Sequence, residues 1–168
     1  MYNLNPYLYP YYYYNPFIFY PVFPQPYLYR QATLMDYGPN PFVIDIEEAT
    51  VNNNNFRTTL WTGNHLQLTL MSIPVGDDIG LEIHPNIDQF IRIEEGQGMV
   101  LMGNSKDNLD FRQHVKEDDI FIVPAGKWHN LINVGNTPIK LYSIYAPVQH
   151  PKGTIHHTKK EALENHHM

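Results

Sequence analysis

Apolar and polar residues alternate over short runs between residues 57 and 146, and turn residues separate these runs. Alternation with a period of two is typical of half-buried strands, and Asn and Gly readily supply the positive φ of tight hairpin turns. The pattern therefore predicts an all-β fold, closed as a barrel or a sandwich. The predicted strands cover residues 57–62, 65–73, 79–84, 88–94, 97–103, 109–115, 119–123, 128–133 and 138–146.

The N-terminal part of the chain follows other patterns. Residues 1–29 contain ten tyrosines, six prolines and no charged side chain, which predicts an extended, partly polyproline-like tail. Further along, Phe42–Ile46 alternates as a strand does, and Glu47–Val51 fits one helical turn. We divide the chain into a Tyr/Pro-rich low-complexity tail (1–30), a β-barrel domain (31–150) and a C-terminal tail (151–168).

The C-terminal tail carries one helix signal. Thr158 and Glu161 have the spacing of a capping box, which predicts a short helix that ends near Glu164. Five histidines are scattered over this end of the chain, and we expect them to be solvated. They are His150, His156, His157, His166 and His167.

Composition excludes several classes of function. The net charge is −6 and no long basic run occurs, so nucleic acid is not an expected partner. The absence of cysteine excludes disulfides and thiolate metal ligands. No stretch approaches the roughly 18 consecutive apolar residues that a membrane span needs.

Metal-type side chains occur in two spaced groups. The first group reads Gly76-x5-Glu82-x-His84-x4-Gln89-x6-Gly96, and the second reads Pro124-x-Gly126-x2-His129-x3-Asn133. Residues i and i+2 on a strand share a face, so Glu82 and His84 should project together into the barrel. Gln89 and His129 would join them from two further strands, where four donors can meet around a metal ion or a small ligand.

Other polar residues near these groups have plainer expected roles. Tyr142 and Tyr145 have opposite parity on the last predicted strand, so only one of them can face inward. Arg92 has parity opposite to that expected for an inward residue and should lie outside or at the rim. Asn133 should tie a turn to backbone groups.

The spacing of the two groups resembles the two motifs of the cupin superfamily. In cupins the first motif carries a His-x-His pair and a glutamate, so Glu82 replaces the first histidine and Gln89 replaces the glutamate. The resemblance covers roughly residues 36–158. Over this range the chain is similar to small bacterial single-domain cupins of the mannose-6-phosphate-isomerase-like type. It implies a double-stranded β-helix, or jelly-roll, barrel.

The same resemblance implies a ligand set and partners. Glu82, His84, Gln89 and His129 would bind a divalent ion such as Zn, Mn, Fe or Ni, and Glu82 is also the candidate catalytic residue. A small-molecule ligand and a homodimer are expected, with residues 36–48 as a strand that the two subunits could exchange.

Three functions stay open at this point. The first is a metal-dependent enzyme, isomerase-like or oxygenase-like, acting on a small polar metabolite such as a sugar or sugar phosphate in the cytoplasm. The second is a structural or assembly protein of the spore coat or spore surface, because residues 1–29 are similar in composition to tyrosine-rich spore-coat segments and could adhere to protein surfaces. The third is a small-ligand binding module without catalysis.

Overall fold

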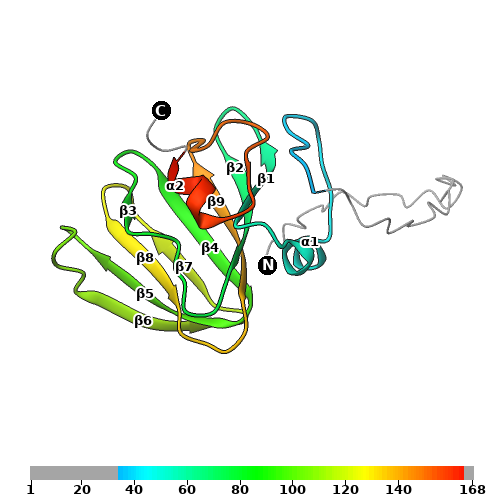
Figure 1. The fold of residues 1–168 in the computed structure, drawn as a ribbon. Helices are drawn as coiled ribbons and strands as arrows, with labels where there is room; N and C mark the ends of the chain where they lie inside the picture. The colour runs from blue at the N-terminus through cyan, green and yellow to red at the C-terminus, as the bar shows by residue number, and fades with distance from the viewer. Residues whose placement is uncertain (1–33, 165–168) are drawn as a thin grey trace, which may run out of the picture. The chain divides into compact units, whose positions relative to one another are not determined.

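Ten strands and two short helices make up the part of the chain that the computed structural model describes, residues 34–164 (Figure 1). The expectations for the tail at residues 1–30 and for His166 and His167 lie outside these residues. The elements are α1 (Ile46–Asn52), β1 (Arg57–Thr62), β2 (Gln67–Ile73), β3 (Glu82–Ile83), β4 (Asp88–Glu95), β5 (Gln97–Gly103), β6 (Phe111–Lys116), β7 (Ile120–Val123), β8 (Trp128–Asn133), β9 (Ile139–Ala146), β10 (Ile155–His156) and α2 (Lys159–Glu164).

The strands form two antiparallel sheets. One sheet has six strands in the order β10-β1-β2-β9-β4-β7, and the other has four in the order β3-β8-β5-β6. Figure 1 shows the two sheets facing each other. The all-β prediction is therefore confirmed, and eight of the predicted strands begin and end within two residues of the observed ones.

The predicted strand at 79–84 is wrong in extent, because only Glu82–Ile83 pairs as a strand. Gly80 adopts a φ of +92°, and its amide donates to the side chain of Asp78. Such a local turn takes the backbone out of the extended conformation. The preceding segment still follows β8, because Ile79 N donates to Leu131 O at 3.1 Å.

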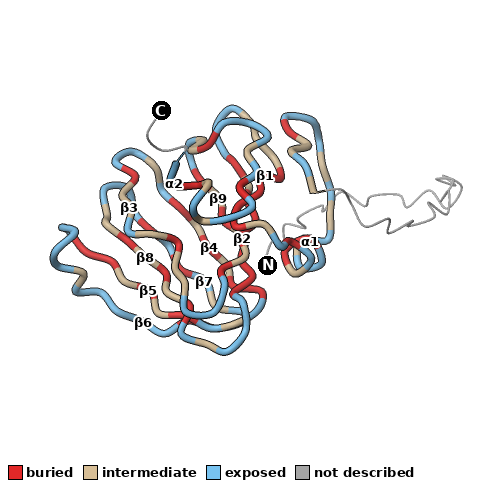
Figure 2. Tube along the Cα trace, in the orientation of Figure 1, coloured by how far each residue is buried: buried red, intermediate tan, exposed pale blue. Residues whose placement is uncertain are grey.

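The main core lies between the sheets. Figure 2 shows buried residues recurring along the central strands β4, β9 and β8. Ile91, Ile93, Leu131 and Leu141 are each no more than 1% exposed. Burial of this aliphatic surface is the main favourable contribution to the stability of the barrel.

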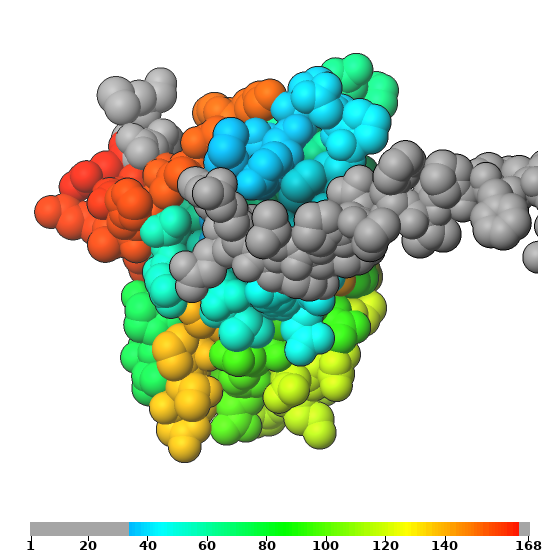
Figure 3. All heavy atoms as spheres, turned by 90° about the vertical axis from the view of Figure 1, so that its right-hand side faces the viewer, coloured from blue at the N-terminus to red at the C-terminus, as the bar shows by residue number. Residues whose placement is uncertain are grey.

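A second, smaller core covers the outer face of the six-stranded sheet. Ala49 of α1 packs there with Leu60 and Leu70, and Phe42 and Ile44 pack against them. In Figure 3 the blue and cyan atoms of this N-terminal segment cover part of that face. The strand predicted at Phe42–Ile46 is wrong, because these residues alternate toward the sheet surface without pairing to another strand.

The chain after residue 150 packs onto the barrel. β10 pairs with β1, and Ala162 of α2 belongs to the main core. The capping box is present in modified form: Thr158 Oγ accepts from Glu161 N at 3.3 Å, while Glu161 Oε2 accepts from His157 N at 2.6 Å.

The expectation of solvated histidines is wrong for two of them. His150 is 6% exposed and His156 is 7% exposed, whereas His157 is exposed. The Gln67 side chain holds the backbone of His150 in the interior. Gln67 Oε1 accepts from His150 N at 2.9 Å, and Gln67 Nε2 donates to His150 O at 2.8 Å. His156 is buried because β10 is added to the edge of the sheet. Among the described residues, no helix has the length and apolar character that a bilayer crossing would require.

Asn133 ties a turn to the backbone, as predicted. Its Nδ2 donates to Ile73 O at 3.0 Å and to Thr137 O at 2.9 Å, and its Oδ1 accepts from Gly135 N at 2.9 Å. The side chain is 2% exposed, and its bond to Ile73 O is buried. The last residue of β8 is thereby joined to the end of β2 and to the turn that precedes β9.

Replacing Asn133 with Ala should lower the free energy of unfolding by about 2 to 3 kcal/mol, because the buried carbonyl of Ile73 loses its donor and two further hydrogen bonds are lost. Urea unfolding followed by circular dichroism measures this change. Asn136 is exposed and is the matched control, so Asn136→Ala should change stability by less than about 0.5 kcal/mol. Equal effects of the two substitutions would contradict the role assigned to Asn133.

Candidate metal centre

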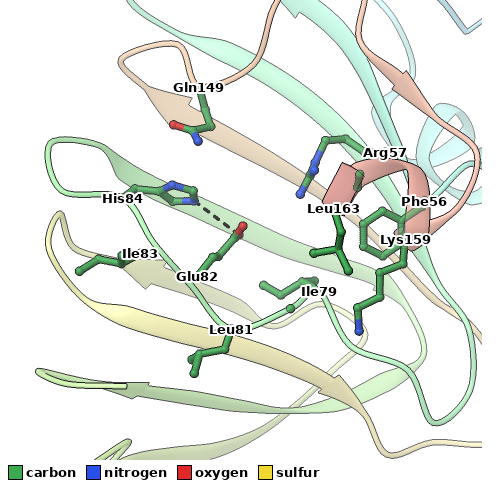
Figure 4. A pocket seen from close by; sticks show the side chains of 12 residues that line it. Phe56, Arg57, Ile79, Leu81, Glu82, Ile83, His84, Gln149, Lys159 and Leu163 are labelled. Atoms are coloured by element: carbon green, nitrogen blue, oxygen red, sulfur yellow. Dashed lines mark ion pairs between the residues drawn. The ribbon is translucent and has the colours of Figure 1, made fainter. Parts of the chain in front are cut away.

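Strands β3 and β8 bring Glu82 and His129 together, because the two residues are register partners across this antiparallel pair. His84 follows two residues after Glu82 and points toward the same space (Figure 4). Glu82 Oε1 lies 3.4 Å from His84 Nε2 and 3.4 Å from His129 Nε2. One carboxylate oxygen therefore faces two imidazole nitrogens.

Both imidazoles present Nε2 to this space without another partner. His84 is 5% exposed and His129 is 1% exposed, and neither Nε2 has a hydrogen-bond partner. His129 Nδ1 lies 3.1 Å from the carbonyl oxygen of Lys127. A carbonyl oxygen can only accept, so Nδ1 carries a proton. Nε2 is then the ring nitrogen that binds a metal when the imidazole is neutral and that donates to the Glu82 carboxylate when it is protonated.

The charge of Glu82 is stabilised by its neighbours. Burial alone would raise the pKa of this carboxyl, but His129, His84 and the positive charge of Arg57 outweigh burial and hold the pKa well below its ordinary range. Glu82 is therefore a carboxylate at neutral pH and a very weak base. This property suits a metal ligand better than a proton carrier.

A backbone contact joins the two sequence motifs at the site. Gly126 N donates to His84 O at 2.8 Å, and Gly126 has a φ of +78°. A side chain at this left-handed position would be strained. The glycine of the second motif thus helps to place the histidine of the first.

The three side chains fit a divalent ion. One ligand atom from each of Glu82, His84 and His129 lies within 4.8 Å of the others. Ligands at about 2.0 to 2.2 Å from a tetrahedral ion are roughly 3.3 to 3.6 Å apart, which agrees with the two distances of 3.4 Å. Two neutral imidazoles and one carboxylate are donors that Zn, Fe, Mn and Ni accept.

Gln89 enters the interior from the opposite sheet. It lies on β4, in register with Tyr145 of β9, and donates from Nε2 to Ser143 Oγ at 2.8 Å. Its Oε1 is buried and has no hydrogen-bond partner. A free buried amide oxygen can accept from a bound water or a ligand hydroxyl. Its role as a metal ligand stays a prediction.

The inner face of the six-stranded sheet is polar at one end of the barrel and apolar at the other. Near the site, Gln67 and Gln89 are both register partners of Tyr145. At the other end the register partners are apolar, with Ile73 opposite Ile139. The site therefore occupies the polar end of the interior, and the aliphatic core fills the other end.

Of Tyr142 and Tyr145, the residue that faces the interior of the barrel is Tyr145. Its side chain is fully buried, and its ring meets the edge of His84 with centroids 5.7 Å apart. Burial is the main reason that its pKa is raised, so the phenol stays protonated at neutral pH. Tyr142 instead stacks on Phe90, and Arg92 lies at the surface, where it contacts Glu94 and Asp118, as expected.

A cavity of 290 Å³ leads to the metal-type residues. Glu82, His84 and Arg57 line it, and α2 contributes Lys159 and Leu163 (Figure 4). Arg57 was not predicted from the sequence, because the first four residues of β1 are all buried and do not alternate between two faces. A charged residue at the start of a predicted strand is the one signal that could have pointed to it.

The comparisons with known proteins agree with this architecture. The family model described as a cupin domain matches residues 69–145. YrkC of Bacillus subtilis (strain 168) is 63% identical over 134 residues, which are 80% of this chain and 72% of YrkC. A protein of Acanthamoeba polyphaga mimivirus is 45% identical over 116 residues, which are 68% of this chain and 70% of that protein.

Solved structures show the same fold. The crystal structure of BH2720 from Bacillus halodurans is 60% identical, has a TM-score of 0.77, and covers 77% of this chain and 98% of its own. A Klebsiella pneumoniae protein with a double-stranded β-helix domain has a TM-score of 0.54 at 21% identity, covering 70% of this chain and 100% of its own. The latter likeness concerns the fold alone.

The barrel and its histidine–carboxylate site define a cupin-domain protein. Within that class, the chain belongs to the family that includes YrkC of Bacillus subtilis.

Replacing His84 and His129 together with Ala should abolish stoichiometric metal binding, because only one of the three ligand-type side chains remains. Mass spectrometry of metal content, on untagged protein purified without added metal, measures this loss. His114→Ala is the matched control, since His114 is an exposed histidine on β6 and should not affect metal content. Equal metal content in the double variant and the control would refute the site.

Proposed function

We propose that this protein is a metal-dependent cupin enzyme that acts on a small polar metabolite. The observation that carries the proposal is the placement of Glu82 Oε1 at 3.4 Å from two buried Nε2 atoms that have no other partner. Buried polar atoms without partners are costly, so their convergence on one point indicates a bound group.

Glu82, His84 and His129 would hold the metal ion. When bound, a divalent ion supplies Lewis-acid polarisation of a carbonyl or hydroxyl oxygen. Lys127 O orients His129 through Nδ1, and the ionised Glu82 neutralises part of the positive charge. Gln89 Oε1 offers an acceptor for a ligand hydroxyl from the facing sheet.

Glu82 was also predicted to be the catalytic residue. Its pKa well below the ordinary value makes it a poor acceptor of protons at neutral pH, so we assign it mainly to charge and metal binding.

A sugar or sugar phosphate is our proposed substrate, with an isomerase-like reaction. The cavity of 290 Å³ admits only a small molecule, and its polar groups lie beside the metal-type residues. The ligand-binding module is the runner-up, because the same cavity would serve a ligand that is bound and released unchanged. Turnover distinguishes the two proposals.

The test is a substrate screen with metal-loaded protein against aldose and ketose sugars and their phosphates. We expect product formation that stops when a chelator removes the metal and returns when the metal is restored. Thermal stabilisation by a sugar without any product would favour the binding module. The absence of both effects would overturn the proposal.

Homodimerisation and surface association through residues 1–29 stay predictions, as do the cytoplasmic and spore-coat locations. Light scattering of the full chain and of a chain lacking residues 1–29 would measure both the oligomeric state and any self-association.

Replacing Glu82 with Gln should weaken metal binding by more than about tenfold, because the site loses its only carboxylate. Because the pKa of Glu82 lies below its ordinary value, the carboxylate stays charged from about pH 8 down to about pH 5.5. The ratio of wild-type to variant affinity should therefore be constant over that interval. Competition with a chromophoric chelator measures both affinities.

Glu117→Gln makes the same change at an exposed glutamate and should leave metal affinity at the wild-type value. A wild-type advantage that shrinks between about pH 8 and about pH 5.5 would show that Glu82 takes up a proton there, contrary to its assigned ionisation.

A further inference from the structure

Arg57 places a buried positive charge on the wall of the cavity. It is the first residue of β1, it is 2% exposed, and it lines the cavity together with Glu82. Figure 4 shows its guanidinium and the carboxylate of Glu82 directed into the same space from different strands. Arg57 is a lining residue rather than a metal-type donor, because a guanidinium offers only N–H donors.

The groups around the Arg57 guanidinium compensate its positive charge only in part. No ion pair of Arg57 occurs within the described part of the chain, and its Nε is buried without an acceptor. The ring of Phe56 lies 5.7 Å from the guanidinium carbon and offsets part of the cost of burial. Burying a positive charge without an anionic partner lowers the stability of the fold. A bound anion would compensate the charge of Arg57 and explain why an arginine is buried here.

Glu82 acts on Arg57 only at longer range. The positive charge of Arg57 helps to lower the pKa of Glu82, so the two groups are near each other. The carboxylate oxygen Oε1 already faces the two imidazoles at 3.4 Å, and in the proposed function it binds the metal ion. The Tyr145 hydroxyl is a neutral neighbour of the guanidinium and gives it no opposite charge. The positive charge of Arg57 is therefore available to an anion that enters the cavity.

The other cation of the cavity is already neutralised. Lys159 Nζ lies 2.8 Å from a carboxylate oxygen of Asp77 and 2.8 Å from one of Asp78. Arg57 is thus the lining cation that has no acidic partner among the described residues. Its planar fork of N–H donors matches the oxygens of a carboxylate or a phosphate.

We propose that Arg57 binds the oxyanion, a carboxylate or a phosphate, of the small ligand that enters this cavity. The inference deepens the proposed function and rests on it, because it places the anionic end of the ligand on Arg57 and its hydroxyl or carbonyl end near Glu82, His84 and His129. It narrows the substrate class from polar metabolites in general to anionic ones, such as a sugar phosphate or a sugar acid.

The test uses the full chain, both zinc-loaded and metal-stripped, with inorganic phosphate, glycolate and neutral glycerol as probes. Calorimetry and thermal shift measure binding. We expect phosphate, glycolate or both to bind and to raise Tm in the stripped protein, while glycerol does neither. Binding of phosphate alone points to a phosphate ester, and binding of glycolate alone points to a carboxylic acid. No binding of either anion to the wild-type protein would overturn the proposal.

Two variants test the residue itself. Arg57→Gln should weaken anion binding by about tenfold to a hundredfold, because charged hydrogen bonds are lost. Arg57→Lys keeps a cation at the site but loses the planar fork of N–H donors, so this variant should bind the anions less tightly than wild type does. It replaces Arg57→Gln as the test if the Gln variant does not fold. Wild-type anion affinity in a folded Arg57 variant would refute the proposal.

The control is Arg92→Gln, which removes a surface arginine and should bind the anions as wild type does. Metal content separates this inference from the proposed function. Arg57 variants should retain zinc, whereas His84→Ala/His129→Ala should lose zinc and still bind the anion in the stripped assay. Loss of zinc in a folded Arg57→Lys variant would show that Arg57 acts on the metal site instead.

Discussion

The buried carboxylate of Glu82 is the interaction on which the rest of the site depends. A negative charge in the interior of a barrel is unfavourable unless positive or proton-donating groups surround it. Here the two imidazoles lie at 3.4 Å, and Arg57 contributes a full positive charge nearby. Each of these groups would be difficult to bury without the others, so they form one electrostatic unit, with a cavity on one side that admits a further charged group.

The barrel supports this unit by dividing its interior into two halves. At one end, aliphatic side chains such as Ile73, Ile93 and Leu141 exclude water and provide most of the favourable burial. At the other end, Gln67, Gln89 and Tyr145 form a polar wall opposite the short strand β3. The apolar half stabilises a fold whose polar half would be marginal by itself, which is how a small domain can maintain a preformed site.

Much of the fold could be predicted because alternation and turn residues are local properties. The strands from β4 to β9 lie close to the predicted ranges. All of them except β6 have alternating buried residues and end at or just before Gly, Asn or Pro. Phe42–Ile46 was misread because alternation reports burial of one face and not hydrogen bonding to a neighbouring strand. His150 and His156 were misread because their burial depends on Gln67 and β1, which are distant in sequence.

The sequence by itself determined that Glu82 and His84 share a face, that a second histidine follows at the spacing of a partner strand, and that glycines mark the turns between them. These features follow from the two-residue period of a strand and from the φ values that only glycine adopts easily. Only the tertiary structure decided that Arg57 lines the same cavity as Glu82, that Lys159 is neutralised by Asp77 and Asp78, and that the amide oxygen of Gln89 is buried without a partner. Those outcomes depend on which strands lie opposite each other, and that arrangement is set by the packing of the whole barrel rather than by any local pattern.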